Sequence, residues 1–177
     1  MCKRWKSILW KRSRTSGAEN RDAQIVSCTK GGYAIEFTEY LFYYITYMAT
    51  ILVVEDEKPL SSILGRALKK ADYTVGFAYD GEEAIVKAKT MNPDLILLDL
   101  ILPKVNGFKV LEQIKKDPDV SHIPVIVLSN LGDDTDIKDS LRLGAIDYYV
   151  KAQHPLLEIV EIVTKFLKTH RVPTKEE

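Results

Sequence analysis

The chain has 177 residues, enough for one well-packed domain and a shorter additional segment, since single domains cluster at roughly 100 to 150 residues. Hydrophobic residues make up 46% of the chain and charged residues 28%, which is ordinary for a soluble globular protein. The formal net charge is zero, so the overall charge indicates no class of partner.

The first 47 residues differ in kind from the rest of the chain. Residues 1–47 contain 8 Lys and Arg against 4 Asp and Glu, a charge of +4, whereas residues 48–177 contain 17 against 21, a charge of −4. We expect residues 1–47 to be a partly disordered N-terminal extension, residues 48–170 to be the folded domain, and residues 171–177 to be a frayed tail.

The residue types exclude several classes of site. Both cysteines, Cys2 and Cys28, lie in the extension, so the sequence indicates neither a disulfide framework nor a cysteine metal cluster, and a reducing, cytoplasmic setting fits best. The longest uncharged stretch, Tyr40 to Val54, is too short to span a bilayer. The histidines lack the spacing of metal-binding motifs, and we expect surface positions for all three: His122, His154 and His170.

From Thr50 onward, short apolar runs alternate with segments of helical periodicity. This alternation predicts an α/β fold in which helices cover both faces of a doubly wound parallel sheet. The predicted strands are Ile51–Val54, Thr74–Tyr79, Leu95–Leu100, Val125–Leu128 and Ile146–Val150.

A helix is predicted after each strand. Pro59 suits the first turn of the first helix, and Gly144 suits the position just beyond the end of the fourth. The last helix starts at Pro155. In the first helix, the residues expected to face the core are Leu60, Ile63, Leu64, Ala67, Leu68 and Ala71.

Acidic and polar residues stand at the ends of the predicted strands. Glu55 and Asp56 follow the first strand, and Asp99 lies near the end of the third. Ser129 follows the fourth strand and Lys151 the fifth. Ligands of open parallel sheets bind beyond the carboxyl ends of the strands, so we expect these side chains to converge on one rim. Each residue alone is more often a turn, cap or surface residue; their joint occurrence favours a site.

The chemistry of this set favours phosphoryl transfer. Three neighbouring carboxylates repel one another unless a cation lies among them, and oxygen ligands without His or Cys favour Mg²⁺. Lys151 adds a compact positive charge that can meet a phosphoryl oxygen. Asp99, central in the set, is the natural nucleophile.

From Thr50 to Leu167 the sequence resembles the receiver domain of two-component response regulators. The resemblance rests on the acidic pair Glu55-Asp56, the block "LDLILPKVNG" around Asp99, Ser129 about 30 positions later, and "DYYVK" at Lys151. It implies a flavodoxin-like sheet with strand order 2-1-3-4-5.

The resemblance also implies roles for these residues. Asp99 would accept a phosphoryl group from a histidine kinase or phosphotransfer protein. The backbone carbonyl of Ile101 would join Glu55, Asp56 and Asp99 in holding Mg²⁺. Two further residues would bind the phosphoryl oxygens: Ser129 and Lys151.

A response to phosphorylation is implied as well. The phosphoryl group would recruit Ser129, and Tyr148, three residues before Lys151, would turn inward and alter the surface of the fourth helix, fifth strand and fifth helix. Tyr149 alternates to the other side of the strand and is expected in the core. One departure is visible: the family usually has proline after the lysine, and this chain has Ala152.

The expected output is a changed protein contact. No output domain is recognisable in the sequence, so we expect a stand-alone regulator that acts on a separate protein or a second copy of itself, with no nucleic acid, no membrane and no enzymatic turnover. Two alternatives stay open. One is a receiver-like scaffold that is never phosphorylated. The other is a doubly wound enzyme, such as an Asp-nucleophile phosphatase, which would want an acid where Ile101 stands, or a flavodoxin-like redox protein.

The extension can be tested by truncation. "MATILVVEDE" from Met48 reads as a natural receiver start, and the preceding residues are either translated upstream DNA or a structural appendage. We favour the first, and expect a chain starting at Met48 to fold and accept phosphate like the full chain. A melting temperature lower by more than about 5 °C, roughly the effect of 1 kcal/mol, would instead assign the extension a structural role.

Overall fold

The structure is a computed structural model that describes residues 49–170. The predictions for residues 1–47, including Cys2 and Cys28, and for residues 171–177 lie outside the described residues. None of the described helices is long and apolar enough to cross a membrane. The elements, in chain order, are β1 (Thr50–Val54), α2 (Lys58–Lys70), β2 (Thr74–Ala78), α3 (Gly81–Met91), β3 (Leu95–Leu98), α4 (Gly107–Lys116), β4 (Val125–Ser129), α5 (Asp134–Arg142), β5 (Asp147–Val150), the 3-10 helix η1 (Lys151–Gln153) and α6 (Leu156–His170).

The five strands form one parallel sheet in the order β2-β1-β3-β4-β5, which confirms the predicted doubly wound fold and strand order. Each strand differs from its predicted range at one end: β1 begins at Thr50, β2 ends at Ala78, β3 ends at Leu98, β4 extends to Ser129 and β5 begins at Asp147. Neighbouring strands end at matching levels, with Val54 opposite Leu98 and Ser129 opposite Val150. The residues that follow the strands therefore start from one edge of the sheet.

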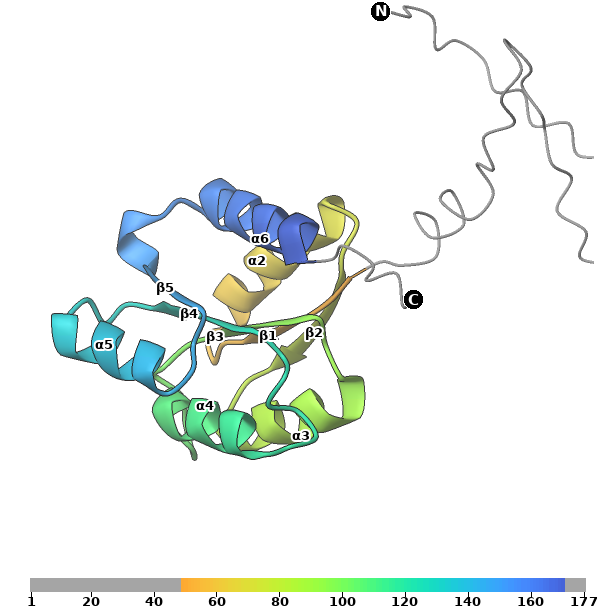
Figure 1. The fold of residues 1–177 in the computed structure, drawn as a ribbon. Helices are drawn as coiled ribbons and strands as arrows, with labels where there is room; N and C mark the ends of the chain where they lie inside the picture. Colours follow the sequence, from red (N-terminus) through yellow and green to blue (C-terminus); the bar gives the residue numbers. More distant parts are fainter. Residues whose placement is uncertain (1–48, 171–177) are drawn as a thin grey trace, which may run out of the picture. The chain divides into compact units, whose positions relative to one another are not determined.

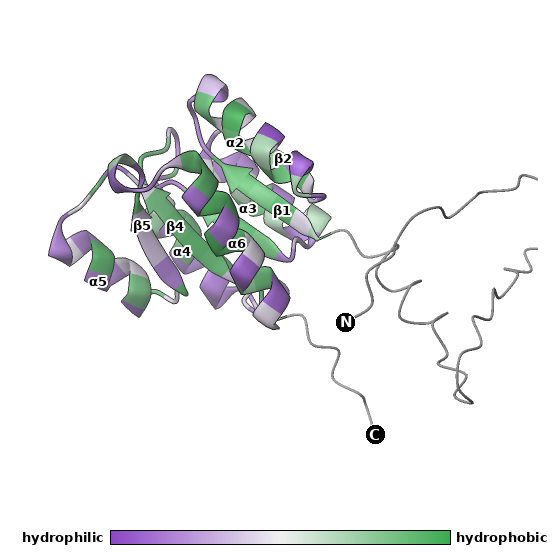
Figure 2. Cartoon of the chain, turned by 90° about the horizontal axis from the view of Figure 1, so that it is seen from above, coloured by the Kyte–Doolittle hydropathy of each residue, from purple (hydrophilic) through white to green (hydrophobic). Residues whose placement is uncertain are grey.

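Helices cover the sheet on both faces (Figure 1). Helices α3 and α4 lie on one face, and α2 and α6 lie on the other. The three central strands are buried along almost their whole length. In Figure 2, β1 and β4 are coloured mostly hydrophobic, whereas the helices alternate between hydrophobic and hydrophilic residues. Burial on both faces explains why these strands are continuous apolar runs rather than alternating patterns.

Helix α2 is rotated relative to the predicted apolar stripe. Ile63, expected in the core, is 46% exposed, and that part of the prediction is wrong. Leu64 and Leu68 are buried, as predicted, and the other buried positions are Ser61 and Gly65, which the predicted stripe did not include. A Cβ atom at Gly65 would lie 2.3 Å from Cζ of Phe77, so the absent side chain leaves room for that ring. The small residues Ser61 and Gly65 face the sheet, and at Gly65 the ring of Phe77 fills the space that a side chain would occupy.

Helix α5 is weakly anchored compared with the other helices. Its only buried residue is Ser140, whose hydroxyl donates to the carbonyl of Asp136 at 2.8 Å. Leu141 is 44% exposed. The helix is followed by Gly144 in the left-handed region, with φ of 104°, which confirms its predicted role as the terminating glycine.

Helix α4 begins where the chain returns to the end of β3. The side chain of Asn106 caps the helix by accepting a hydrogen bond from the Lys109 N–H at 3.0 Å. The N–H of Gly107 donates to the carbonyl of Leu100 at 2.9 Å. A Cβ atom at Gly107 would lie 2.3 Å from the carbonyl oxygen of Asp99, so glycine is what allows this close approach.

This close approach yields a stability prediction. Gly107→Ala should lower the free energy of unfolding by roughly 1–3 kcal/mol, because the new methyl group meets backbone atoms that cannot yield without moving Asp99. Gly132→Ala is the matched control, since a Cβ there is no closer than 3.8 Å to its neighbours. Urea denaturation of both variants measures the difference. Equal stabilities would show that the loop after β3 adapts freely.

Candidate functional site

Four strands bring polar side chains to one rim of the sheet, as the sequence predicted. Glu55 and Asp56 follow β1, and Asp99 follows β3. Ser129 is the last residue of β4, and Lys151 is the first residue of η1 after β5. The structure thus brings together all five side chains that the strand-end pattern selected.

The three acids form one cluster. A carboxylate oxygen from each of Glu55, Asp56 and Asp99 lies within 4.8 Å of the others. Glu55 and Asp99 are 4% and 5% exposed, whereas Asp56 is exposed. Two of the three charges are therefore buried, which requires compensation from neighbouring groups.

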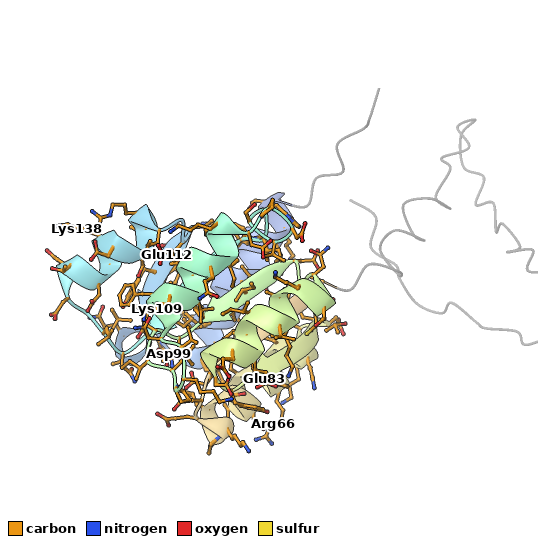
Figure 3. All side chains as sticks on the ribbon, turned by 90° about the horizontal axis from the view of Figure 1, so that it is seen from below. Arg66, Glu83, Asp99, Lys109, Glu112 and Lys138 are labelled. Carbon is orange, nitrogen blue, oxygen red and sulfur yellow. The ribbon has the colours of Figure 1, made fainter. Side chains whose placement is uncertain are left out.

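Asp99 receives three hydrogen bonds. Its Oδ1 accepts from the Ser129 hydroxyl at 3.0 Å and from the Ile101 N–H at 3.0 Å, while its Oδ2 accepts from Nζ of Lys151. Figure 3 shows Asp99 inward of peripheral charged side chains such as Lys138. Asp99 lies at the predicted rim of the sheet, but its carboxylate is buried there, and Lys151 offsets its charge.

Lys151 joins two strands through its ammonium group. Its Nζ also donates to Oε2 of Glu55, so one cation pairs with two buried carboxylates. Burial opposes its charge, but the hydrogen bonds with Asp99 and Glu55 outweigh burial and raise the pKa of Lys151. Burial, together with the nearby charge of Asp99, raises the pKa of Glu55 despite the lowering effect of Lys151.

Glu55 keeps one oxygen without a protein partner. Its Oε1 is buried and accepts no hydrogen bond from the described residues. A buried carboxylate oxygen in this state is uncommon and needs a chemical explanation. Its position in a three-carboxylate cluster makes it a free ligand atom for a hard cation.

Tyr148 lies next to this site. It packs partly buried against the core cluster under α3 and α4, and its hydroxyl donates to the carbonyl of Leu131 at 2.7 Å. Burial raises the pKa of Tyr148. The Leu131 carbonyl was missed from the sequence, since no residue type marks a backbone acceptor. Tyr149 packs against the opposite core cluster, as predicted.

The remaining predicted position lies in the loop after β3. Ile101 has a side chain that is 55% exposed, and its N–H is fixed on Asp99. Gly107, which packs against the Asp99 carbonyl, was not singled out from the sequence, although a glycine at the start of a helix was the available signal.

The sequence matches a known protein family. Residues 51–164 match the family model described as "Response regulator receiver domain". The chain belongs to this family. Receiver domains of this family serve two-component systems, which agrees with the resemblance inferred from the sequence.

Individual relatives agree with the family. The chain is 42% identical over 105 residues to a probable transcriptional regulator, ycf27, of Guillardia theta, covering 59% of this chain and 40% of that protein. The chain spans about half the length of the curated relatives it matches.

Two solved structures are also similar. The phosphorylated cyanobacterial phytochrome response regulator RcpA is 35% identical, with a TM-score of 0.63, covering 72% of this chain and all of that one. The Mn²⁺-bound form of response regulator Rcp1 is 32% identical, with a TM-score of 0.59, covering 72% and 97% of the two chains.

The contribution of the Lys151 ammonium group can be tested by measuring the free energy of unfolding at different pH values. Lys151→Met should lower the free energy of unfolding in EDTA at pH 8 by roughly 3–5 kcal/mol, because two buried carboxylates lose their counter-charge. Lys116→Met, which breaks an exposed pair with Glu112, is the control and should change it by about 0–1 kcal/mol.

The sign of the pH dependence follows from Glu55. Without Lys151 its pKa rises further above the ordinary value of 4.5. An acid whose pKa is higher in the folded chain than in the unfolded chain destabilises the fold above both values, and this loss is relieved as pH falls through the folded-state pKa. The deficit of Lys151→Met should therefore shrink between pH 8 and pH 5. A constant deficit would contradict the pairing.

Proposed function

We propose that this receiver domain accepts a phosphoryl group on Asp99 from a histidine kinase or phosphotransfer protein, in a Mg²⁺-dependent reaction. The observation that carries the proposal is the convergence of one buried carboxylate with a lysine, a serine and two further acids. Together these groups supply what in-line phosphoryl transfer needs.

The residues fit a magnesium ion. Glu55, Asp56 and Asp99 would hold it, together with the backbone carbonyl of Ile101, and the unpartnered Oε1 of Glu55 is a ready ligand atom. The donors are all oxygen, which suits a hard divalent ion. The Mn²⁺-bound relative Rcp1 supports a divalent ion in this family. When bound, the ion would neutralise charge on the acids and on the incoming phosphoryl group.

The transfer step is a displacement at phosphorus. A carboxylate oxygen of Asp99 attacks, an oxygen–phosphorus bond forms, and the phosphorus–nitrogen bond of the donor histidine breaks, with its electron pair staying on the imidazole nitrogen. Lys151 is positioned to follow the charge from the carboxylate to the phosphoryl oxygens. The Ser129 hydroxyl, now on Asp99, is the donor that would move to the phosphoryl group.

The output we propose is a changed protein contact made by the domain. Ser129 links the reacting carboxylate to Leu131 in the loop before α5, because the Leu131 N–H donates to its Oγ at 3.4 Å, and the Leu131 carbonyl in turn accepts from the Tyr148 hydroxyl. Movement of Ser129 would thus reach the surface of α5, β5 and α6. The partner would be a downstream protein or a second copy of this chain. Residues 48–177 carry a charge of −4, which disfavours contact with nucleic acid or an anionic membrane. The proposed compartment is the cytoplasm.

Phosphorylation can be tested directly by intact mass. With Mg²⁺ and acetyl phosphate, where acetate is the leaving group, the chain should gain one phosphoryl adduct that base removes, and EDTA should suppress it. Asp99→Asn should abolish the adduct while the fold persists, because the nucleophile is lost and Ser129 and Lys151 keep polar partners. Asp119→Asn, an exposed aspartate far along the chain, is the control. An adduct on Asp99→Asn, or none on the unchanged chain, would refute the proposal.

A further inference from the structure

Lys151 depends on a loop that lacks the family's usual proline. The lysine opens η1, and the residue after it is Ala152. Its Nζ must nevertheless reach Glu55 and Asp99 on two other strands. A lysine has four rotatable bonds and loses much conformational freedom when fixed, so the backbone that carries it has to be held by other contacts.

His154 closes this loop from its far end. Its ring stands edge-on to the ring of Tyr149, with centroids 5.1 Å apart and planes at 88°. The Tyr149 hydroxyl donates to Oδ2 of Asp147 at 2.6 Å, which fixes the aromatic ring in turn. The backbone N–H of His154 donates to the carbonyl of Lys151 at 3.4 Å. The histidine therefore connects β5 to the loop that carries the lysine.

The same imidazole also contacts α6. Its Nδ1 is buried and lies 3.1 Å from Oε1 of Glu158, one turn along from Pro155. Glu158 is about half exposed, so solvent weakens this contact. An edge-to-face ring pair stabilises beyond the burial of its area. The ring contact with Tyr149 is thus the stronger of the two.

We propose that His154 is a positioning residue for Lys151. By packing its ring on Tyr149, it sets the path of residues 151–153 and so directs the lysine toward Glu55 and Asp99. The backbone hydrogen bond to the Lys151 carbonyl does not depend on the residue type at position 154. Its effect on phosphorylation rests on the function proposed above, whereas its effect on the Lys151 pairing does not. No sequence pattern indicated this role, because an isolated histidine matches no motif.

A double-mutant cycle on stability provides the deciding test. The loss of melting temperature caused by Lys151→Met is measured in EDTA at pH 8, once in the unchanged chain and once in His154→Ala. If His154 directs the lysine, the loss in the His154→Ala background is at most half as large. His122→Ala removes an exposed histidine from another loop and should leave the loss undiminished. If His154→Ala does not fold, the cycle is repeated with Tyr149→Leu, which removes the same ring contact.

The rate of adduct formation from acetyl phosphate gives a second readout. His154→Ala should slow it on the order of tenfold, as expected for a misplaced charged group, and His154→Phe, which keeps a ring against Tyr149, should restore most of the rate. If Lys151→Met lowers the melting temperature as much in the His154→Ala background as in the unchanged chain, the inference is overturned, whatever the rate of adduct formation. If no variant forms an adduct, the proposed function fails and the stability cycle alone decides the role of His154.

Discussion

One ammonium group between two buried carboxylates is the interaction on which the site depends. Lys151 lies after the edge strand β5, Glu55 after β1 and Asp99 after β3, so their pairing ties the end of the sheet together across three strands. Without this cation, two acids that are almost inaccessible to water would repel each other in a medium that screens charge poorly. The side chains that form the site are therefore the same ones that balance the buried charge of the fold.

The apolar sheet holds the three charged side chains in position. The central strands are buried on both faces, and their register places the residues that follow them at matching levels. Close packing leaves little freedom for a strand to slide, since a shift of one residue would move every side chain to the wrong face. The long apolar run before Asp99 is thus the support of a polar site.

Much of this architecture could be predicted from local patterns. Strand runs, helix stripes and the strand-end residues depend on neighbours in the sequence, and the comparisons confirm the family that they indicated. The burial of Asp99 could not be predicted, because it depends on Lys151, 52 positions away. Ile63 was misplaced for a similar reason: the rotation of α2 is set by the ring of Phe77 on a different element. Residues whose role depends on distant packing leave no local signal.

The sparse burial of helix α5 affects how the free energy of local opening varies across the domain. Because Ser140 is its only buried residue, we expect its local opening free energy to lie below that of the buried central strands. Coupling between sites in proteins is commonly worth about 1–3 kcal/mol, too little to rearrange a close-packed core but enough to shift a weakly packed helix. A change at the strand ends would therefore move this helix before it moved the sheet.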